Sequence, residues 1–141
     1  MLNEAHFNRL QWIYRTNPCN QHYTTEIVIA EGKTEIVLPI RPDYLHGGGV
    51  VHGSVYFKLL DDAGTFAVNS LVKDFAILTA SFNIYFTRPI STGSIRAVGR
   101  VVHESRRLFI AEAEALDMDG RLLARGSGSY MRSTIALPEV G

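Results

Sequence analysis

One long helical pattern in a chain otherwise made of strand-like segments constrains the fold most. From Ser54 to Val72 apolar residues recur every three to four positions, which predicts an amphipathic helix over about 54–72. Its main apolar stripe comprises Tyr56, Leu59, Leu60, Ala63, Ala67 and Leu71. A second face carries Phe57, Asp61, Gly64, Thr65 and Val68. Because a helix that is apolar on two faces is usually covered on both, we expect a sheet on one side and a partner subunit on the other.

The segments around this helix predict an α+β domain. Before it come a short amphipathic helix over about 3–15, ended by Asn17-Pro18, and a hairpin of Tyr23–Ala30 and Lys33–Ile40. After it come strands at 78–86, 94–102, 108–116 and 121–132, of which the last three can form a meander. The absence of βαβ alternation predicts one antiparallel sheet of five to six strands packed on the long helix. We therefore expect a single domain over residues 1–141.

The strand predicted at 78–86 shows a period of two. Even positions from Leu78 to Phe86 are apolar, and most of the odd positions between them are polar. We expect the even-numbered side chains to be buried on one face of the sheet.

Composition limits the possible partners and compartments. The 14 basic and 14 acidic residues balance, so no net charge favours nucleic acid or an anionic membrane. Cys19 is the one cysteine, which excludes an intrachain disulfide and favours a reducing compartment. Neither a signal peptide nor an apolar run of membrane-spanning length is recognisable. We expect a soluble cytoplasmic protein.

The segment His46–Ser54 is rich in glycine and opens the long helix. Because the first amides of a helix lack intrahelical acceptors, Gly53 is a candidate oxyanion-hole donor for acyl transfer. Such a reaction also needs a base or nucleophile, and Asp61 is the nearest candidate. We expect the Asp61 carboxylate to point at a neighbouring chain and to lie within reach of the amides that begin its own helix.

These residues resemble the signature of the PaaI-like, 4-hydroxybenzoyl-CoA-type hotdog thioesterases. His52-Gly53-Ser54 with Asp61 nine residues after the histidine stands where that family has His-Gly-Gly and a carboxylate. The similarity continues through Thr79, the segment Phe86–Pro89 with Gly93, and the segment 119–124, and covers roughly residues 32–132. It implies the hotdog fold and a homodimer or dimer of dimers with sites at the subunit interface.

The resemblance also implies residue roles. Asp61 is the catalytic carboxylate, as base or nucleophile, the Gly53 amide polarises the carbonyl, and Thr79 of the opposite subunit holds the attacking water. His46 stands where the family has asparagine or glutamine, and Ser54 replaces a glycine and can act as a helix cap. His52 is either part of the chemistry or a residue that fixes the loop.

The implied reaction is hydrolysis of an acyl- or aryl-CoA thioester without a metal or other cofactor. Tyr56 and Phe57 are candidate walls of an acyl pocket, and arginines suit the phosphates of CoA. The substrate-binding candidates are Ser54, Tyr56, Phe57, Asn83, Arg88, Arg106 and Arg107. The spacing of His46, His52 and Asp61 fits no recognised zinc pattern. A non-catalytic acyl-CoA-binding module and a hydroxyacyl-thioester dehydratase remain as alternatives.

Overall fold

The computed structural model describes residues 4–141 as helices packed against one antiparallel sheet. In chain order the elements are α1 (Glu4–Thr16), η1 (Pro18–His22), β1 (Glu26–Ala30), β2 (Lys33–Pro39), η2 (Pro42–Tyr44), α2 (Gly53–Asn69), β3 (Phe75–Phe86), β4 (Ser94–Glu104), β5 (Phe109–Leu116) and β6 (Leu122–Ala136). Residue 3, the predicted start of the first helix, lies outside the described residues. No helix within residues 4–141 is long and apolar enough to cross a membrane.

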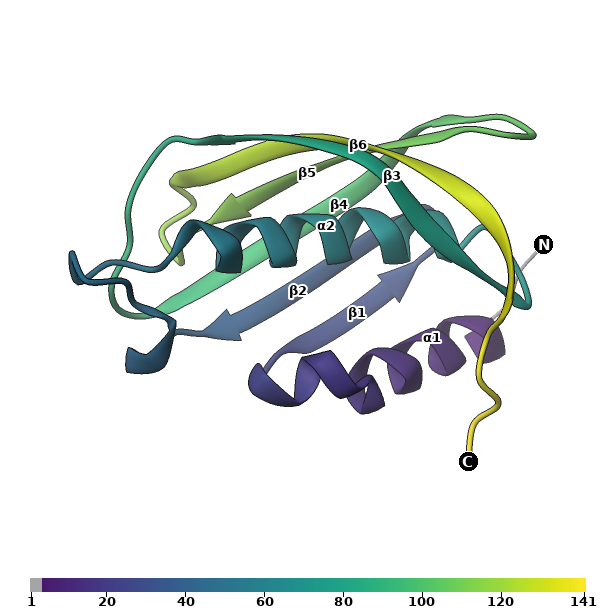
Figure 1. The fold of residues 1–141 in the computed structure, drawn as a ribbon, viewed down its shortest axis with the longest axis horizontal. Helices are drawn as coiled ribbons and strands as arrows, with labels where there is room; N and C mark the ends of the chain where they lie inside the picture. Colours follow the sequence, from purple (N-terminus) through teal and green to yellow (C-terminus); the bar gives the residue numbers. More distant parts are fainter. Residues whose placement is uncertain (1–3) are drawn as a thin grey trace.

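The six strands form a sheet in the order β1-β2-β4-β5-β6-β3. The predicted meander is confirmed, because β4, β5 and β6 pair in sequence. Strand β3 leaves the long helix and crosses to the far edge, where it pairs with β6. The sheet curves around α2, with α1 beside β1 (Figure 1). This is the hotdog arrangement, with the predicted α+β class.

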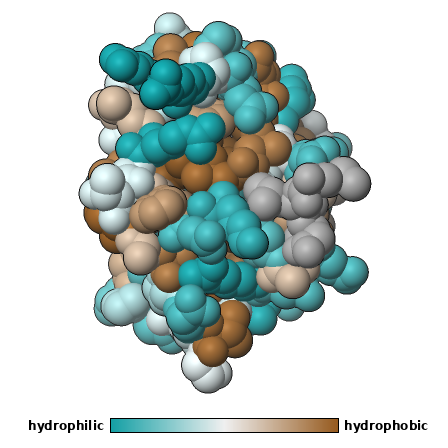
Figure 2. All heavy atoms as spheres, turned by 90° about the vertical axis from the view of Figure 1, so that its right-hand side faces the viewer, coloured by the Kyte–Doolittle hydropathy of each residue, from teal (hydrophilic) through white to brown (hydrophobic). Residues whose placement is uncertain are grey.

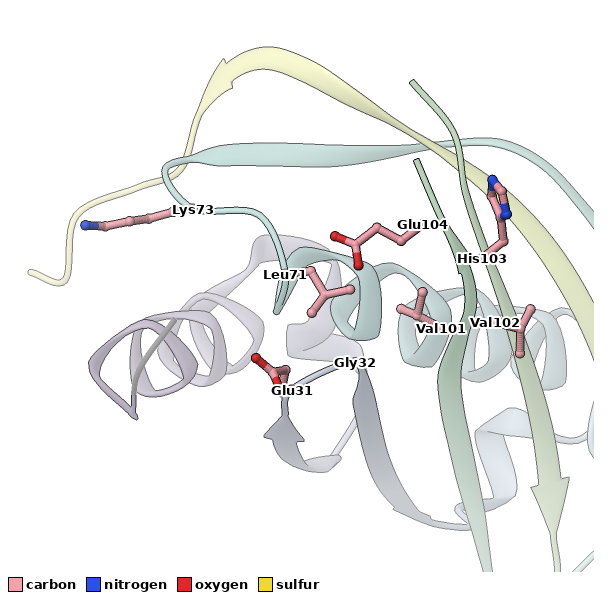
Figure 3. A pocket seen from close by; sticks show the side chains of 8 residues that line it. All are labelled: Glu31, Gly32, Leu71, Lys73, Val101, Val102, His103 and Glu104. Carbon is pink, nitrogen blue, oxygen red and sulfur yellow. The ribbon is translucent and has the colours of Figure 1, made fainter. Parts of the chain in front are cut away.

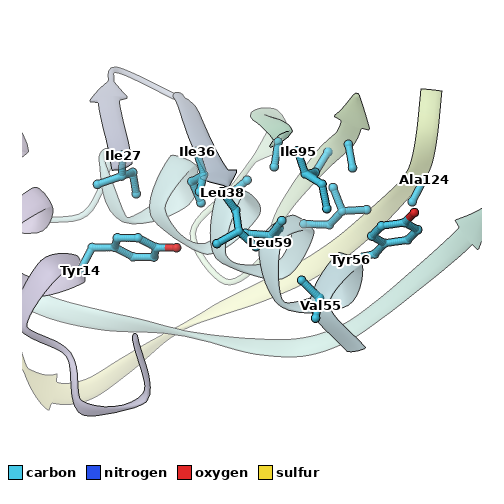
Figure 4. Close-up of a cluster of buried hydrophobic side chains, with 14 of the residues drawn as sticks. Tyr14, Ile27, Ile36, Leu38, Val55, Tyr56, Leu59, Ile95 and Ala124 are labelled. Atoms are coloured by element: carbon cyan, nitrogen blue, oxygen red, sulfur yellow. The ribbon is translucent and has the colours of Figure 1, made fainter. Parts of the chain in front are cut away.

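The main core lies between α2 and the concave face of the sheet. Leu59, Leu60 and Ala63 have no exposed surface, and they pack with residues of β1, β2 and β4 such as Ile27, Ile36, Leu38 and Ile95 (Figure 4). A Cβ at Gly99 of β4 would stand 2.5 Å from the Ala63 carbonyl oxygen, so the helix approaches the strand closely. Burying each such leucine or isoleucine contributes about 1.5–3 kcal/mol.

The second face of α2 is covered differently from the prediction. Val68 is buried with Val72, Ile77 and Phe109 in a cluster of the same chain. Gly64 is buried under Tyr130 of β6. The expectation that a partner subunit covers this whole face is therefore wrong, because β3 and β6 curve over its C-terminal half.

The helix α2 also differs in its bounds from the predicted 54–72. It begins at Gly53 and ends at Asn69, with Ser70 as the C-cap. The Ser70 hydroxyl donates to the Ala67 carbonyl at 2.6 Å, and the side-chain amide of Asn69 donates to the carbonyls of Val72 and Phe75. The Ser70 bond satisfies a carbonyl of the last turn, and the Asn69 bonds hold the segment that follows the helix.

Strand β3 contradicts the predicted alternation in its first half. A bulge between Thr79 and Ser81 shifts the register with β6, so that Thr79 pairs with the buried Tyr130. Leu78 is 48% exposed, whereas Ile77 is buried. The extra residue reverses which of the odd- and even-numbered side chains face α2, so that Phe82 and Ile84 pack against the core as predicted, whereas Phe86 is 54% exposed. The bulge turns the Thr79 side chain toward α2.

Candidate active site

The N-terminus of α2 is capped by His52. Its Nδ1 accepts a hydrogen bond from the Ser54 amide at 3.0 Å and lies 2.8 Å from the Ser54 hydroxyl. The His52 carbonyl accepts from the Val55 amide. Ser54 was expected to be the cap, but it is the residue that His52 caps, because Ser54 lies inside the first turn. The His52 cap thus fixes the start of the helix.

The Gly53 amide is left unpaired by this cap, since it has no acceptor within residues 4–141. It borders a pocket of about 370 Å³, whose lining is Val50, Val51, Gly53, Tyr56, Phe86, Thr87, Arg88 and Pro89. Phe86 lies so near that a Cβ at Gly53 would stand 3.1 Å from its ring. An unpaired amide at the positive end of a helix, beside apolar walls, suits a developing oxyanion.

His46 lies in the exposed loop that precedes α2. Its Nδ1 accepts a hydrogen bond from the Gly48 amide at 2.8 Å, and its ring meets the His52 ring edge-on at 6.3 Å between centroids. The structure thus brings His46, His52 and Gly53 together at the start of the helix. With Nδ1 occupied, Nε2 is the atom of His46 that can meet a ligand.

Asp61 lies two turns farther along α2, where the predicted Thr79 meets it. The Thr79 Oγ1 donates to the Asp61 Oδ1 at 2.8 Å. Partial burial raises the pKa of Asp61 above its ordinary value, while hydrogen bonds from Thr79 and Tyr130 and the charge of Lys58 oppose that rise. A partly desolvated carboxylate with a raised pKa is suited to act as a general base. The resemblance gave Thr79 to the opposite subunit, yet here it belongs to the same chain as its Asp61.

Asp61 and Gly53 cannot act on one carbonyl within a single chain. They are eight residues apart on one continuous helix, a separation of about 12 Å along its axis. The expectation that Asp61 reaches the first amides of its own helix is therefore wrong. The chain carries two candidate half-sites, one at Gly53 with His46 and His52, and one at Asp61 with Thr79.

The remaining predicted substrate-binding residues are dispersed. Phe57 is 39% exposed one turn before Asp61 and packs edge-on against Phe82. Tyr56 is buried, stacks on Phe86 and donates to the Arg88 carbonyl, so Tyr56 and Arg88 both belong to the Gly53 pocket. Asn83 alternates with the core-facing Phe82 and Ile84 and lies on the outer face of the sheet.

Arg106 and Arg107 are exposed in the β4–β5 turn, at the end of the molecule opposite the start of α2 (Figure 1). The structure therefore does not bring them to Gly53 of the same chain. A contact of these arginines with a substrate bound at Gly53 would therefore require another copy of the chain.

A larger cavity, of about 840 Å³, lies away from both half-sites. The β1–β2 turn, the segment after α2 and the end of β4 line it, with Glu31, Leu71, Lys73 and His103 among the side chains (Figure 3). This end of the molecule shows apolar side chains between hydrophilic ones (Figure 2). None of the residues predicted to be catalytic borders this cavity.

The sequence prediction missed two residues of the half-sites. Phe86 was considered as an apolar strand residue and as part of a motif, not as a pocket residue, yet it lines the pocket beside Gly53. Tyr130 Oη lies 3.4 Å from Asp61 Oδ1. The sequence feature that could have indicated Tyr130 is Gly64 in the middle of the helix. Glycine is unfavourable there unless another side chain needs the space.

Comparison with known proteins decides the family. The model of the family described as "Thioesterase superfamily" matches residues 48–124, more than half of the chain and the segment that holds Gly53, Asp61 and Thr79. The chain belongs to the thioesterase superfamily. A curated relative from Sulfurisphaera tokodaii, named "Putative esterase", is 31% identical to this thioesterase-superfamily chain. The match covers 72% of this chain and 76% of the relative.

A relative from Saccharolobus solfataricus, likewise named a putative esterase, is 34% identical over 60% of this chain, and the match spans just over half, 56%, of that relative's length. Among solved structures, the PaaI protein of the Escherichia coli phenylacetic acid degradation operon superposes with a TM-score of 0.88 at 21% identity, covering 98% of this chain and all of that one. A conserved Pseudomonas aeruginosa protein reaches 0.77 at 30% identity, covering 82% and 93%. The structural likenesses show the hotdog fold, and the family match over residues 48–124 shows the superfamily.

Proposed function

We propose that this chain hydrolyses acyl- or aryl-CoA thioesters to the free acid and CoA. The observation that carries the proposal is the pair of complementary half-sites. One presents the unpaired Gly53 amide beside an apolar pocket, and the other presents Asp61 held by Thr79 on a partly open face. Together they supply the oxyanion donor and the carboxylate that acyl transfer requires.

In this proposal the thioester carbonyl oxygen accepts a hydrogen bond from the Gly53 amide. Asp61 either takes a proton from the water that attacks the carbonyl carbon, or attacks that carbon itself and is released by water. In both routes the carbon–sulfur bond breaks, the thiolate leaves as CoA, and water supplies the hydroxyl of the acid. The acyl group occupies the pocket that Tyr56 and Phe86 help to line, and the exposed Arg88, which also lines it, suits a phosphate of CoA.

Each complete site takes Gly53 from one chain and Asp61 from a second. The separation of about 12 Å along the helix requires this division if both groups act on one carbonyl. The exposed Phe57 and the partly open Asp61 lie on the same face of α2, one turn apart, which suits contact with another copy. We propose a homodimer, alone or within a dimer of dimers.

Release of thiol from short, medium and aryl acyl-CoAs tests this function with wild type, Asp61→Asn and Asp62→Asn side by side. Asp62 is the matched control, because its carboxylate bonds Lys58 and Tyr14 and not the proposed site. We expect Asp61→Asn to lower kcat by about 10²–10⁴-fold, whereas Asp62→Asn keeps a rate near that of wild type. Tight binding of acyl-CoA without turnover by the wild type would contradict hydrolysis and support a binding module.

A further inference from the structure

The two oxygens of the Asp61 carboxylate have different surroundings. Oδ1 accepts from the Thr79 hydroxyl at 2.8 Å and from the Tyr130 hydroxyl at 3.4 Å. Oδ2 has no hydrogen-bond partner within residues 4–141. Two donors from neighbouring strands, β3 and β6, therefore converge on one oxygen and leave the other available.

Tyr130 reaches this position through a slot between two glycines. Its side chain is completely buried, and a Cβ at Gly64 of α2 would overlap its hydroxyl oxygen. A Cβ at Gly128 of β6 would stand 2.6 Å from the same oxygen. Glycine inside a helix is less favourable than alanine by about 1 kcal/mol, so Gly64 is unfavourable locally unless the space serves another group. That group is the Tyr130 hydroxyl.

A simple packing role does not explain the hydroxyl. A phenylalanine ring would fill the same buried space without a polar atom, and a buried hydroxyl is unfavourable unless it finds a partner. Asp61 accepts from the Tyr130 hydroxyl at 3.4 Å, and Thr65 of α2 is a second hydrogen-bonding neighbour of the same hydroxyl. The 3.4 Å distance is long for an O–H···O bond, and such bonds at reacting groups commonly tighten when a substrate is bound.

We propose that Tyr130 is a positioning residue, which with Thr79 orients the Asp61 carboxylate so that Oδ2 faces the water or thioester carbon. This inference rests on the proposed function. The phenol donates to the ionised form of Asp61, so it also opposes the effect of burial on the pKa of that carboxyl. The other titratable groups around Asp61 are Lys58 and Asp62 on α2, while β3 contributes the neutral Thr79.

The test compares Tyr130→Phe with Tyr14→Phe. Tyr14 is a matched control, because it too is a buried tyrosine that donates to a carboxylate of α2, in its case Asp62 at 3.3 Å. For Tyr130→Phe we expect kcat to fall about tenfold or more with KM little changed, and the acidic limb of the kcat/KM profile to move to higher pH. The direction follows because loss of a donor to the carboxylate raises its pKa. Tyr14→Phe should leave the profile in place.

A measurement without turnover separates this inference from the proposed function. Carbon-13 NMR of labelled aspartate side chains gives the pKa of Asp61 directly, with Asp61→Asn identifying the signal. We expect Tyr130→Phe to raise that pKa even if no acyl-CoA is hydrolysed. An unchanged Asp61 titration and an unchanged pH profile in a correctly folded Tyr130→Phe variant would overturn the inference.

Discussion

The Thr79 hydroxyl donates a hydrogen bond to the Asp61 carboxylate at 2.8 Å, joining the edge strand β3 to the middle of α2. The bulge between Thr79 and Ser81 goes with the side of β3 on which Thr79 lies, facing α2, although the residue is exposed. Bulges commonly re-aim side chains next to active sites. The edge strand thus contributes a polar group to a helix that it otherwise covers with apolar residues.

Replacing Thr79 by valine should impair the proposed hydrolysis while preserving the packing. Valine has nearly the same shape but no donor, and a hydrogen bond to a charged group contributes about 1.5–3 kcal/mol, so we expect roughly a tenfold to hundredfold lower kcat. The acidic limb of the pH profile should also move to higher pH, since Thr79 lowers the pKa of Asp61. Thr79→Ser keeps the hydroxyl and serves as the control. Equal profiles for the valine and serine variants would show that this bond is not used.

Removing the Gly53 amide hydrogen should abolish most activity. Gly53→Pro deletes the donor at the first position of α2, where proline is favourable, and His52 already has the extended backbone, φ −63° and ψ 141°, that a following proline prefers. Loss of one oxyanion donor should lower kcat by about 10²–10³-fold. Gly53→Ala is the control, because its Cβ presses on the same Phe86 ring but keeps the amide hydrogen. Equal rates for the two variants would place the oxyanion donor elsewhere.

Neutralising Asp61 should make the protein more stable at neutral pH. Because burial raises the folded-state pKa of Asp61 above its unfolded value, folding favours the protonated form, and stability falls as pH rises through that window. Asp61→Asn removes the ionisation and should raise Tm by a few degrees at pH 7, as expected where activity and stability oppose each other. The gain should shrink below the ordinary pKa of the carboxyl. A thermal scan of both proteins at pH 7 and pH 4 checks this, and a lower Tm at pH 7 would contradict it.

The neighbouring Asp62 belongs to a structural cluster that should respond differently. Lys58 Nζ lies 2.6 Å from Asp62 Oδ2 and also donates to Asn20, which links α2 to η1. Lys58→Met leaves a largely buried carboxylate without its cation and should lower the free energy of unfolding by about 3 kcal/mol at pH 7. The loss should diminish in acid, where Asp62, whose pKa burial already raises, takes up a proton. Urea denaturation at pH 7 and in acid measures the free energy of unfolding of both proteins. A loss that does not depend on pH would contradict the unpaired Asp62 carboxylate as its cause.

The sequence predicted the class of fold because helix and strand periods are local properties. The hydrophobic stripe of α2 and the later strand segments identified the elements and their order. The sequence did not predict which side chains face α2 in the first half of β3. One extra residue at the bulge between Thr79 and Ser81 exchanges the odd and even positions, and the residue types there do not reveal the bulge. The cap was assigned to Ser54 because serine is a common cap, whereas the loop geometry makes His52 the cap, with its Nδ1 accepting from the Ser54 amide.

The sequence predicted which residues belong to the candidate site but not how these residues are arranged in space. The glycine-rich helix start and the carboxylate on the second face indicated Gly53 and Asp61. Because both lie on one continuous helix, the length of eight residues separates them into two candidate half-sites. Tyr130 escaped prediction because its partner lies 69 residues earlier in the chain. Long-range contacts of this kind depend on strand register, which the sequence pattern did not determine at the bulge.

Complementation between two inactive variants tests the central claim, that each complete site draws on two chains. Asp61→Asn and Gly53→Pro are produced together with different tags, and the species that carries both tags is isolated. In a mixed dimer one site combines intact Gly53 with intact Asp61, and the other combines both defects, so we predict about half of the wild-type rate per mixed dimer. A mixed species no more active than either parent would contradict a site shared between two copies.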